Sequence, residues 1–203
     1  MGWAEQAAVR LENEHVRLAP AVPADRASLL AIALDPEIWR YFVSLVETEA
    51  DFDAFFDAAL ASQQAGTRIA FTVTDKHDGR VAGSMSFFNL AESDGRLEIG
   101  WSWLGSHARG GGVNRWAKYL MLEHAFEVLK AERVEFKTDE LNTQARRALS
   151  NIGAHEEGTL RSFNPMPGGR RRNAVFYSVL RAEWPAVAEQ LAAAPKVART
   201  AGG

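Results

Sequence analysis

The chain has 203 residues, of which 47% are hydrophobic and 24% are charged. This length and composition are ordinary for one medium-sized globular domain with a substantial core. The formal net charge of −3 gives no reason to expect nucleic acid or an anionic membrane as a partner. The absence of cysteine excludes disulfides, thiolate metal sites and cysteine nucleophiles.

The first residues lack the basic start and apolar run of a signal peptide, and no apolar run approaches the ~18 residues that span a bilayer. The five histidines show no metal-ligand spacing. We therefore expect a cytoplasmic protein that holds no metal.

Hydrophobic periodicity in the first half of the chain indicates alternating helices and strands. It predicts a strand at 15–20, a helix at 23–34, an aromatic patch at 39–42, a helix at 48–64, and strands at 69–74 and 81–90. The last two strands are joined by Lys76-His77-Asp78-Gly79, a hairpin signal.

The second half continues in the same way. It predicts strands at 97–104, 133–139, 157–163 and 174–180, helices at 114–130 and 142–152, a last helix from 184, and a loose tail over 192–203. No repeat or internal linker is visible. We expect residues 1–203 to form a single α+β domain with its core at about 13–191.

The segment at 97–104 has the period-two pattern of a half-exposed strand. This pattern places Leu97, Ile99, Trp101 and Trp103 on one face and Glu98, Gly100 and Ser102 on the other. A glycine-rich turn, Arg109-Gly110-Gly111-Gly112, then leads into a helix that leaves Arg115, Lys118, Glu127 and Lys130 off its apolar stripe. Free N–H groups at such a helix start are suited to bind a pyrophosphate.

Two other phosphate-binding motifs do not fit this turn, and a connection without a binding role is an alternative. A Walker A loop needs Gly-Lys-Ser/Thr where the chain reads Gly112-Val113-Asn114-Arg115, and a Rossmann fingerprint needs a glycine where Arg115 stands. A plain flexible connection stays open beside anion binding.

Coenzyme A suits this arrangement better than a free nucleotide, because the two amides of its pantetheine arm can pair with an exposed strand. Asn142 either contacts that arm or caps the next helix. Arg109 and Arg147 are candidates to reach phosphates, and Arg170-Arg171-Arg172 is interpreted as an exposed basic turn.

Acyl transfer from coenzyme A to an amine needs a base that removes a proton from the ammonium form before the amine attacks the thioester. Glu98, in the middle of the strand at 97–104, is the candidate for this base. The alternative is a solvated strand glutamate. With no cysteine and no Gly-x-Ser-x-Gly elbow, direct attack by the amine in a ternary complex is the remaining route.

The chain resembles the GNAT acetyltransferases, in the branch around the RimJ/RimL N-acetyltransferases. The resemblance runs from about Val16 to Leu191. It is carried by Glu98-Ile99-Gly100-Trp101-Ser102-Trp103-Leu104-Gly105, Arg109-Gly110-Gly111-Gly112, Ala125-Phe126, Val134-Glu135, Asn142, Arg147-Ala148-Leu149, Ile152-Gly153-Ala154, Glu157-Gly158, Leu160-Arg161, Tyr177-Ser178-Val179-Leu180 and Glu183-Trp184.

The resemblance implies an acyl-CoA N-acyltransferase fold with a mixed, mostly antiparallel sheet flanked by helices. It implies that backbone groups near Ser102 and Leu104 hold pantetheine, that N–H groups from Arg109 through Val113 to Asn114 hold the pyrophosphate, and that Asn142 contacts the arm. It also implies that Trp39, Tyr41 and Phe42 wall the acceptor groove. The family's usual serine three positions after the asparagine is Ala145 here.

We therefore expect an acetyl-CoA-dependent N-acetyltransferase whose acceptor is an amine-bearing small molecule or a protein or peptide N-terminus. The alternative is a non-catalytic acyl-CoA-binding module. The acceptor, the donor of a proton to the leaving thiolate, and homodimerisation stay open at this stage.

Overall fold

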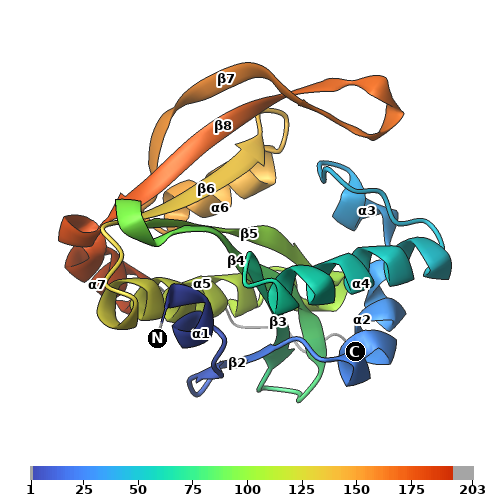
Figure 1. Ribbon diagram of the computed structural model, residues 1–203, viewed down its shortest axis with the longest axis horizontal. Helices are drawn as coiled ribbons and strands as arrows, with labels where there is room; N and C mark the ends of the chain where they lie inside the picture. Colours follow the sequence, from blue (N-terminus) through green and yellow to red (C-terminus); the bar gives the residue numbers. More distant parts are fainter. Residues whose placement is uncertain (1, 194–203) are drawn as a thin grey trace.

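One mixed β-sheet forms the centre of the protein in the computed structural model, which describes residues 2–193 (Figure 1). Its eight strands lie in the order β1-β2-β3-β4-β5-β6-β8-β7. Their bounds are Leu11–Glu12 (β1), Val16–Pro20 (β2), Arg68–Asp75 (β3), Val81–Ala91 (β4), Arg96–Leu104 (β5), Arg133–Asp139 (β6), His155–Pro165 (β7) and Arg171–Leu180 (β8).

Neighbouring strands run antiparallel throughout the sheet, except for β5 and β6, which are parallel. The predicted mixed, mostly antiparallel sheet is therefore confirmed. The parallel pair requires a crossover, and the long connection through α5 supplies it.

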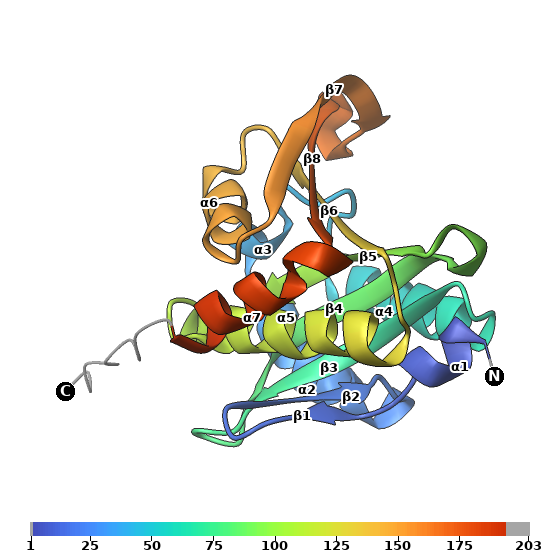
Figure 2. The same ribbon diagram turned by 90° about the vertical axis from the view of Figure 1, so that its left-hand side faces the viewer.

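Helices cover both faces of the sheet. Their bounds are Trp3–Ala7 (α1), Arg26–Ala33 (α2), Pro36–Trp39 (α3), Glu49–Gln64 (α4), Val113–Glu123 (α5), Thr143–Asn151 (α6) and Trp184–Ala193 (α7). Figure 2 shows α5 and α7 in front of the sheet, with α2 and α4 behind it. We call these the α5 face and the α4 face.

Each face buries its own apolar cluster. The cluster on the α5 face includes Leu97, Ile99 and Phe126, and the cluster on the α4 face includes Trp39, Phe52 and Trp103. Helix α4 begins where the sequence predicts, because the Thr48 hydroxyl accepts a hydrogen bond from the Asp51 N–H and the Asp51 carboxylate accepts one from the Thr48 N–H.

Most predicted elements are confirmed to within two residues, and the differences lie at the ends. Helix α5 gives way after Glu123 to a π-helical turn over His124–Val128. The unpredicted helix α1 buries Trp3 and Ala7, so the core also takes in residues before 13. Ala192 and Ala193 belong to α7, not to a tail, and the rest of the predicted tail lies outside the described residues.

The predicted alternation along β5 is wrong beyond Gly100. Ser86 faces Gly100 and Ser84 faces Trp103, so Trp101 and Ser102 together lie opposite one residue of β4. This is a β-bulge, and Trp101 adopts a φ of 50° within it. The extra residue moves Trp101 and Trp103 onto the α4 face, away from Leu97 and Ile99.

No helix within residues 2–193 is both long enough and apolar enough to cross a membrane.

A charged cluster links β6, β7 and β8 in addition to their backbone pairing. The Arg133 guanidinium donates to the Glu157 carboxylate, with 2.6 Å between Nη1 and Oε1, and the Ser178 hydroxyl donates to the same Oε1 at 2.8 Å. These donors lower the pKa of Glu157 to about 2, the Arg133 hydrogen bond being the largest cause. The cluster joins three neighbouring strands.

We expect Glu157→Gln to lower the free energy of unfolding by about 1 kcal/mol at pH 7, since solvent partly screens the pair. A carboxylate with a lowered pKa stabilises the fold above its unfolded pKa and loses that effect as the pH falls to about 2. Urea unfolding of both proteins from pH 7 to pH 3 checks this. A difference that stays constant across that range would contradict it.

Candidate active site

The candidate site begins where β5 and β6 separate. The two strands pair only at Arg96–Arg133, Leu97–Val134 and Glu98–Glu135. Beyond Glu98 no pairing with β6 is found in the described part of the chain, while β5 stays paired with β4 as far as Leu104. One edge of β5 from residue 99 to 104 is therefore open to another extended group.

The glycine-rich loop lies at the end of this open edge and forms the N-terminus of α5. Gly110 and Gly112 adopt φ values of 77° and 88°, which few other residues tolerate. A Cβ on Gly110 would meet no atom within 4 Å, so the space over that residue is empty. In the part of the chain that is described, no backbone hydrogen bond uses the N–H groups of Gly110, Gly111 and Gly112.

The side chain of Arg109 is engaged away from the loop. Its Nε donates to the Leu104 carbonyl at 3.1 Å and its Nη2 to Asp35 Oδ2 at 3.1 Å, while its backbone N–H donates to Ser106. Asp35 caps α3 by accepting from the Glu37 N–H. Arg109 thus ties the glycine loop to the segment predicted to wall the acceptor.

Asn142 and Arg147 lie at the start and in the middle of α6. Asn142 takes the capping role, because its Oδ1 accepts from the Ala145 N–H at 3.0 Å. Arg147 is exposed and lines a hollow of about 250 Å³ together with Thr143, Gln144, Ala148 and Asn151. The structure therefore places Arg147 on a solvent-facing helix surface.

Ser102 and Leu104 occupy the open stretch of β5. Both are half-buried, and Leu104 lies opposite Gly83 of β4. Val113 begins α5 and is buried, and Asn114 is half-buried beside it. The predicted cofactor residues of β5, the loop and α5 therefore follow one another along a single edge.

Glu98 is neither solvated nor free. It is 2% exposed, and its Oε2 accepts from Lys137 Nζ at 2.8 Å and from Asn89 Nδ2 at 2.9 Å. Burial raises the pKa of Glu98, and the contacts with Lys137 and Asn89 oppose that rise. The carboxylate lies at the last β5–β6 pair, where the open edge begins.

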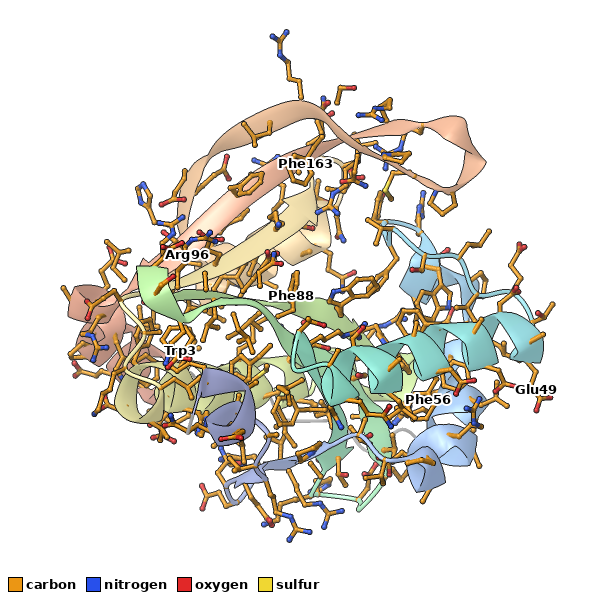
Figure 3. The ribbon with its side chains drawn as sticks, viewed as in Figure 1. Trp3, Glu49, Phe56, Phe88, Arg96 and Phe163 are labelled. Carbon is orange, nitrogen blue, oxygen red and sulfur yellow. The ribbon has the colours of Figure 1, made fainter. Side chains whose placement is uncertain are left out.

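Phenyl rings surround Lys137, the partner of Glu98. Its Nζ lies 6.0, 5.5 and 5.4 Å from the ring centroids of Phe88, Phe163 and Phe176. Figure 3 shows Phe88 at the β4–β5 part of the sheet and Phe163 at the β7–β8 hairpin. These rings attract the ammonium and hold the Lys137–Glu98 pair between the sheet and the hairpin.

The predicted acceptor wall is a set of aromatic rings on the α4 face. Phe42 and Trp101 are half-buried and have centroids 6.1 Å apart, and Tyr41 is half-buried at the same segment. Trp39 is only 2% exposed and donates from Nε1 to the Ala33 carbonyl. Trp39 therefore supports Phe42 from behind, and Phe42 and Tyr41 are the residues that reach solvent.

Two arginines that are not fully exposed lie outside the predicted set of site residues, and the first of them contacts the rings beside this wall. Arg68, at the start of β3, is 7% exposed and stacks over Trp101. The interpretation of Arg172 as part of an exposed turn is wrong: it is half-buried, and its Nε is buried without a hydrogen-bond partner among the described residues. Its neighbour Arg170 pairs with the buried Asp139. The contact of Arg68 with Trp101 depends on the bulge in β5, and no local motif in the sequence predicts that bulge. The sequence therefore does not identify Arg68 as a site residue.

The helical pattern also places Lys118 wrongly, on the polar side of α5. Lys118 is 6% exposed, and its Nζ lies 5.2 Å from the ring centroid of Phe136. Phe136 directly follows Glu135, the last residue of β6 that pairs with β5. Burial lowers the pKa of Lys118 to about 8. A buried ammonium at this point of the sheet is an electrostatic cost that the fold retains.

Among residues 2–193, no group of three or more histidine and carboxylate side chains is placed to hold a metal ion.

An open strand edge that leads to a glycine loop at a helix N-terminus is the arrangement of an acyltransferase fold, and comparison with known proteins gives the family. The model of the acetyltransferase (GNAT) domain matches residues 15–155. The chain belongs to the GNAT acetyltransferase family and is an enzyme of the acetyl-transferring class. Family membership thus favours catalysis over the non-catalytic binding module.

Individual relatives agree with the RimJ/RimL-like branch. YdaF of Bacillus subtilis (strain 168), whose name includes the words ribosomal N-acetyltransferase, is 25% identical over 178 residues, which is 85% of this chain and 94% of YdaF. A T. thermophilus crystal structure described as a candidate acetyltransferase is 37% identical, with a TM-score of 0.83 over 91% of this chain and 96% of that chain. Mycobacterium smegmatis RimJ in complex with CoA-disulfide is 24% identical and shares the fold, with a TM-score of 0.75 over 92% of this chain and 93% of that chain.

We expect Lys118→Met to stabilise the ligand-free protein at pH 7 by about 2–3 kcal/mol, because the folded pKa of about 8 lies below the ordinary 10.5. Below pH 8 the lysine is charged in both states and the full cost of burial applies. As the pH rises from 8 to 10.5 the folded state alone releases the proton, so the difference disappears.

Thermal or urea unfolding across this pH range checks the expectation. Lys130→Met, a change at an exposed lysine beyond the end of the same helical segment, is the control. Equal stability of Lys118→Met and wild type at every pH would show that Lys118 is not a buried uncompensated charge.

Proposed function

We propose that this protein is an acetyl-CoA-dependent N-acetyltransferase that acts on a primary amine, a protein or peptide N-terminus being one class of acceptor. The observation that carries the proposal is the open edge of β5 leading into the glycine loop at the start of α5. The relative named as a ribosomal N-acetyltransferase supports a protein acceptor. A cytoplasmic location is a further proposal that rests on the sequence alone.

The described residues fit acetyl-CoA. The N–H groups of Gly110, Gly111 and Gly112 and the N-terminus of α5 suit the pyrophosphate, with Val113 and Asn114 completing the helix start. The open edge of β5 suits the pantetheine amides near Ser102 and Leu104. Asn142 keeps its side-chain amide N–H groups for the arm, and Arg147 is exposed on the adjacent helix for a phosphate.

When bound, acetyl-CoA supplies an acetyl group activated as a thioester. The residues of the chain orient the amine and take its proton. We propose that Glu98, directly or through a water molecule, accepts the proton of the acceptor ammonium so that the neutral amine attacks. Lys137 holds the carboxylate in place, and the wall of Tyr41 and Phe42 shields the acceptor from bulk water.

An acceptor screen tests the function. Purified protein with acetyl-CoA is offered free amino acids, short peptides, polyamines and aminoglycosides, and released thiol and acetylated product are measured. Transfer to at least one primary amine supports the proposal. Tight acetyl-CoA binding without transfer to any amine would return the protein to the binding-module alternative.

Gly110→Val is expected to abolish measurable acetyl-CoA binding in calorimetry. A β-branched side chain fills the empty space over the loop, and it strains a backbone that has a φ of 77°. Gly79→Val, in a distant turn with a φ of 74° and open space around it, is the matched control for strain alone. Unchanged affinity in Gly110→Val would remove the loop from the cofactor site.

Glu98→Gln is expected to lower kcat by ~10²–10⁴ while the Kd for acetyl-CoA stays within about twofold, because a positioned base acts only in the chemical step. The matched control is Glu135→Gln, at the residue of β6 that pairs with Glu98 in the sheet, and it should leave kcat nearly unchanged. If Glu98→Gln and wild type turn over equally, Glu98 is not the base.

The pH dependence gives a second, independent test of Glu98. A base is active when ionised, so the rate falls as the pH drops through its pKa, and burial places this limb above the range of an ordinary glutamate. Lys137 opposes the rise, so Lys137→Met should move the acidic limb to still higher pH. An acidic limb that does not move in Lys137→Met would assign it to another group.

A further inference from the structure

Arg68 is a buried cation held in one orientation by neutral groups. Its Nε donates to the Ser86 hydroxyl at 2.9 Å, and its guanidinium carbon lies 4.3 Å from the centroid of Trp101 and 5.9 Å from that of Phe55. A guanidinium has five N–H donors. Ser86 is the one hydrogen-bond partner of the Arg68 side chain among the described residues, so the forked end of the side chain keeps its donors.

No carboxylate balances this charge. Arg68 forms no ion pair within residues 2–193, and burial alone lowers its pKa to about 10, which still leaves it charged at neutral pH. A buried ion normally has a counter-charge, because its desolvation is expensive. The guanidinium of Arg68 therefore has N–H donors available for an anion, and an anion would offset the cost of burying its charge.

The surroundings carry the same excess of positive charge. On the α4 face beside the β7–β8 hairpin, Lys137 is paired with Glu98 and Arg170 with Asp139. Arg172 forms no such ion pair among the described residues, and its buried Nε has no hydrogen-bond partner there. Arg172 interacts electrostatically with Asp139 and Glu98, the same two carboxylates that pair with Arg170 and Lys137, so positive charge exceeds negative charge in this cluster.

The position of Arg68 connects it with the acceptor. Trp101, on which it stacks, belongs to the open stretch of β5 and contacts Phe42 of the acceptor wall. Phe55 is the second ring that Arg68 contacts, and its centroid lies 6.4 Å from the ring centroid of Phe42. The guanidinium therefore lies within the ring cluster that would receive the amine substrate.

We propose that the acceptor amine carries an anionic group, a carboxylate or a phosphate, and that Arg68 is the residue that binds this group and selects for it. The inference rests on the proposed N-acetyltransferase function and narrows its substrate class. The planar fork of a guanidinium matches both oxyanions in a two-point contact. Polyamines and aminoglycosides, which bring only positive charge, are disfavoured.

Pairs of amines that differ in one anionic group test the proposal. Glycine against glycinamide probes the carboxylate, and phosphoethanolamine against ethanolamine probes the phosphate. We expect wild-type protein to prefer the anionic member of at least one pair by about tenfold or more in kcat/KM, as expected for a charge-assisted two-point contact. Arg68→Met should remove that preference through a higher KM, and Arg68→Lys should keep part of it, while the exposed Arg10→Met should behave as wild type.

A direct binding measurement separates this inference from the proposed function. Tryptophan fluorescence during titration with each amine, with CoA present, is compared between wild type and Trp101→Phe, because the chain has six tryptophans and only the signal lost in that variant reports on the ring beneath Arg68. Saturable binding of the anionic amines alone supports the anion site even without turnover. Equal turnover of both members of each pair by wild type overturns the inference while the N-acetyltransferase function stands, and it does so whether or not the Arg68 variants fold.

Discussion

The short pairing of β5 with β6 is the constraint on which the site depends. Parallel strands that stayed paired along their length would satisfy their own N–H and C=O groups and leave none for a ligand. Here the pairing ends at Glu98, and within residues 2–193 the remainder of β5 pairs with β4 and with no other strand. One edge of β5 is therefore paired within the sheet, and the other edge is available to a ligand.

The bulge at Trp101 adds a second consequence to this open edge. It turns Trp101 and Trp103 to the α4 face, where Trp101 meets Phe42, Phe55 and Arg68. The strand that carries the candidate cofactor edge therefore also contacts the acceptor wall through Trp101, and Arg109 connects the glycine loop to the α3 segment through Asp35. A left-handed backbone at a tryptophan is strained, and such strain is commonly found at functional sites.

Much of this arrangement follows from local sequence signals, and the remainder does not. The hairpin at Lys76–Gly79, the capping box at Thr48 and the start of α5 after the glycine loop each depend on neighbouring residues, so the sequence predicts these elements correctly. The bulge depends on how β5 pairs with β4, which is a long-range property. The faces of residues beyond Gly100, the burial of Lys118 and the position of Arg68 escape prediction because they depend on such long-range packing.

The central claim is that the open edge of β5 and the glycine loop together bind acetyl-CoA, and backbone hydrogen exchange measures this most directly. The account predicts that saturating acetyl-CoA slows exchange in residues 99–104 and 110–114 together, since both segments gain hydrogen-bond partners, and leaves β7 unchanged. Unaltered exchange in both segments, or protection confined to the α6 surface around Arg147, would contradict the account.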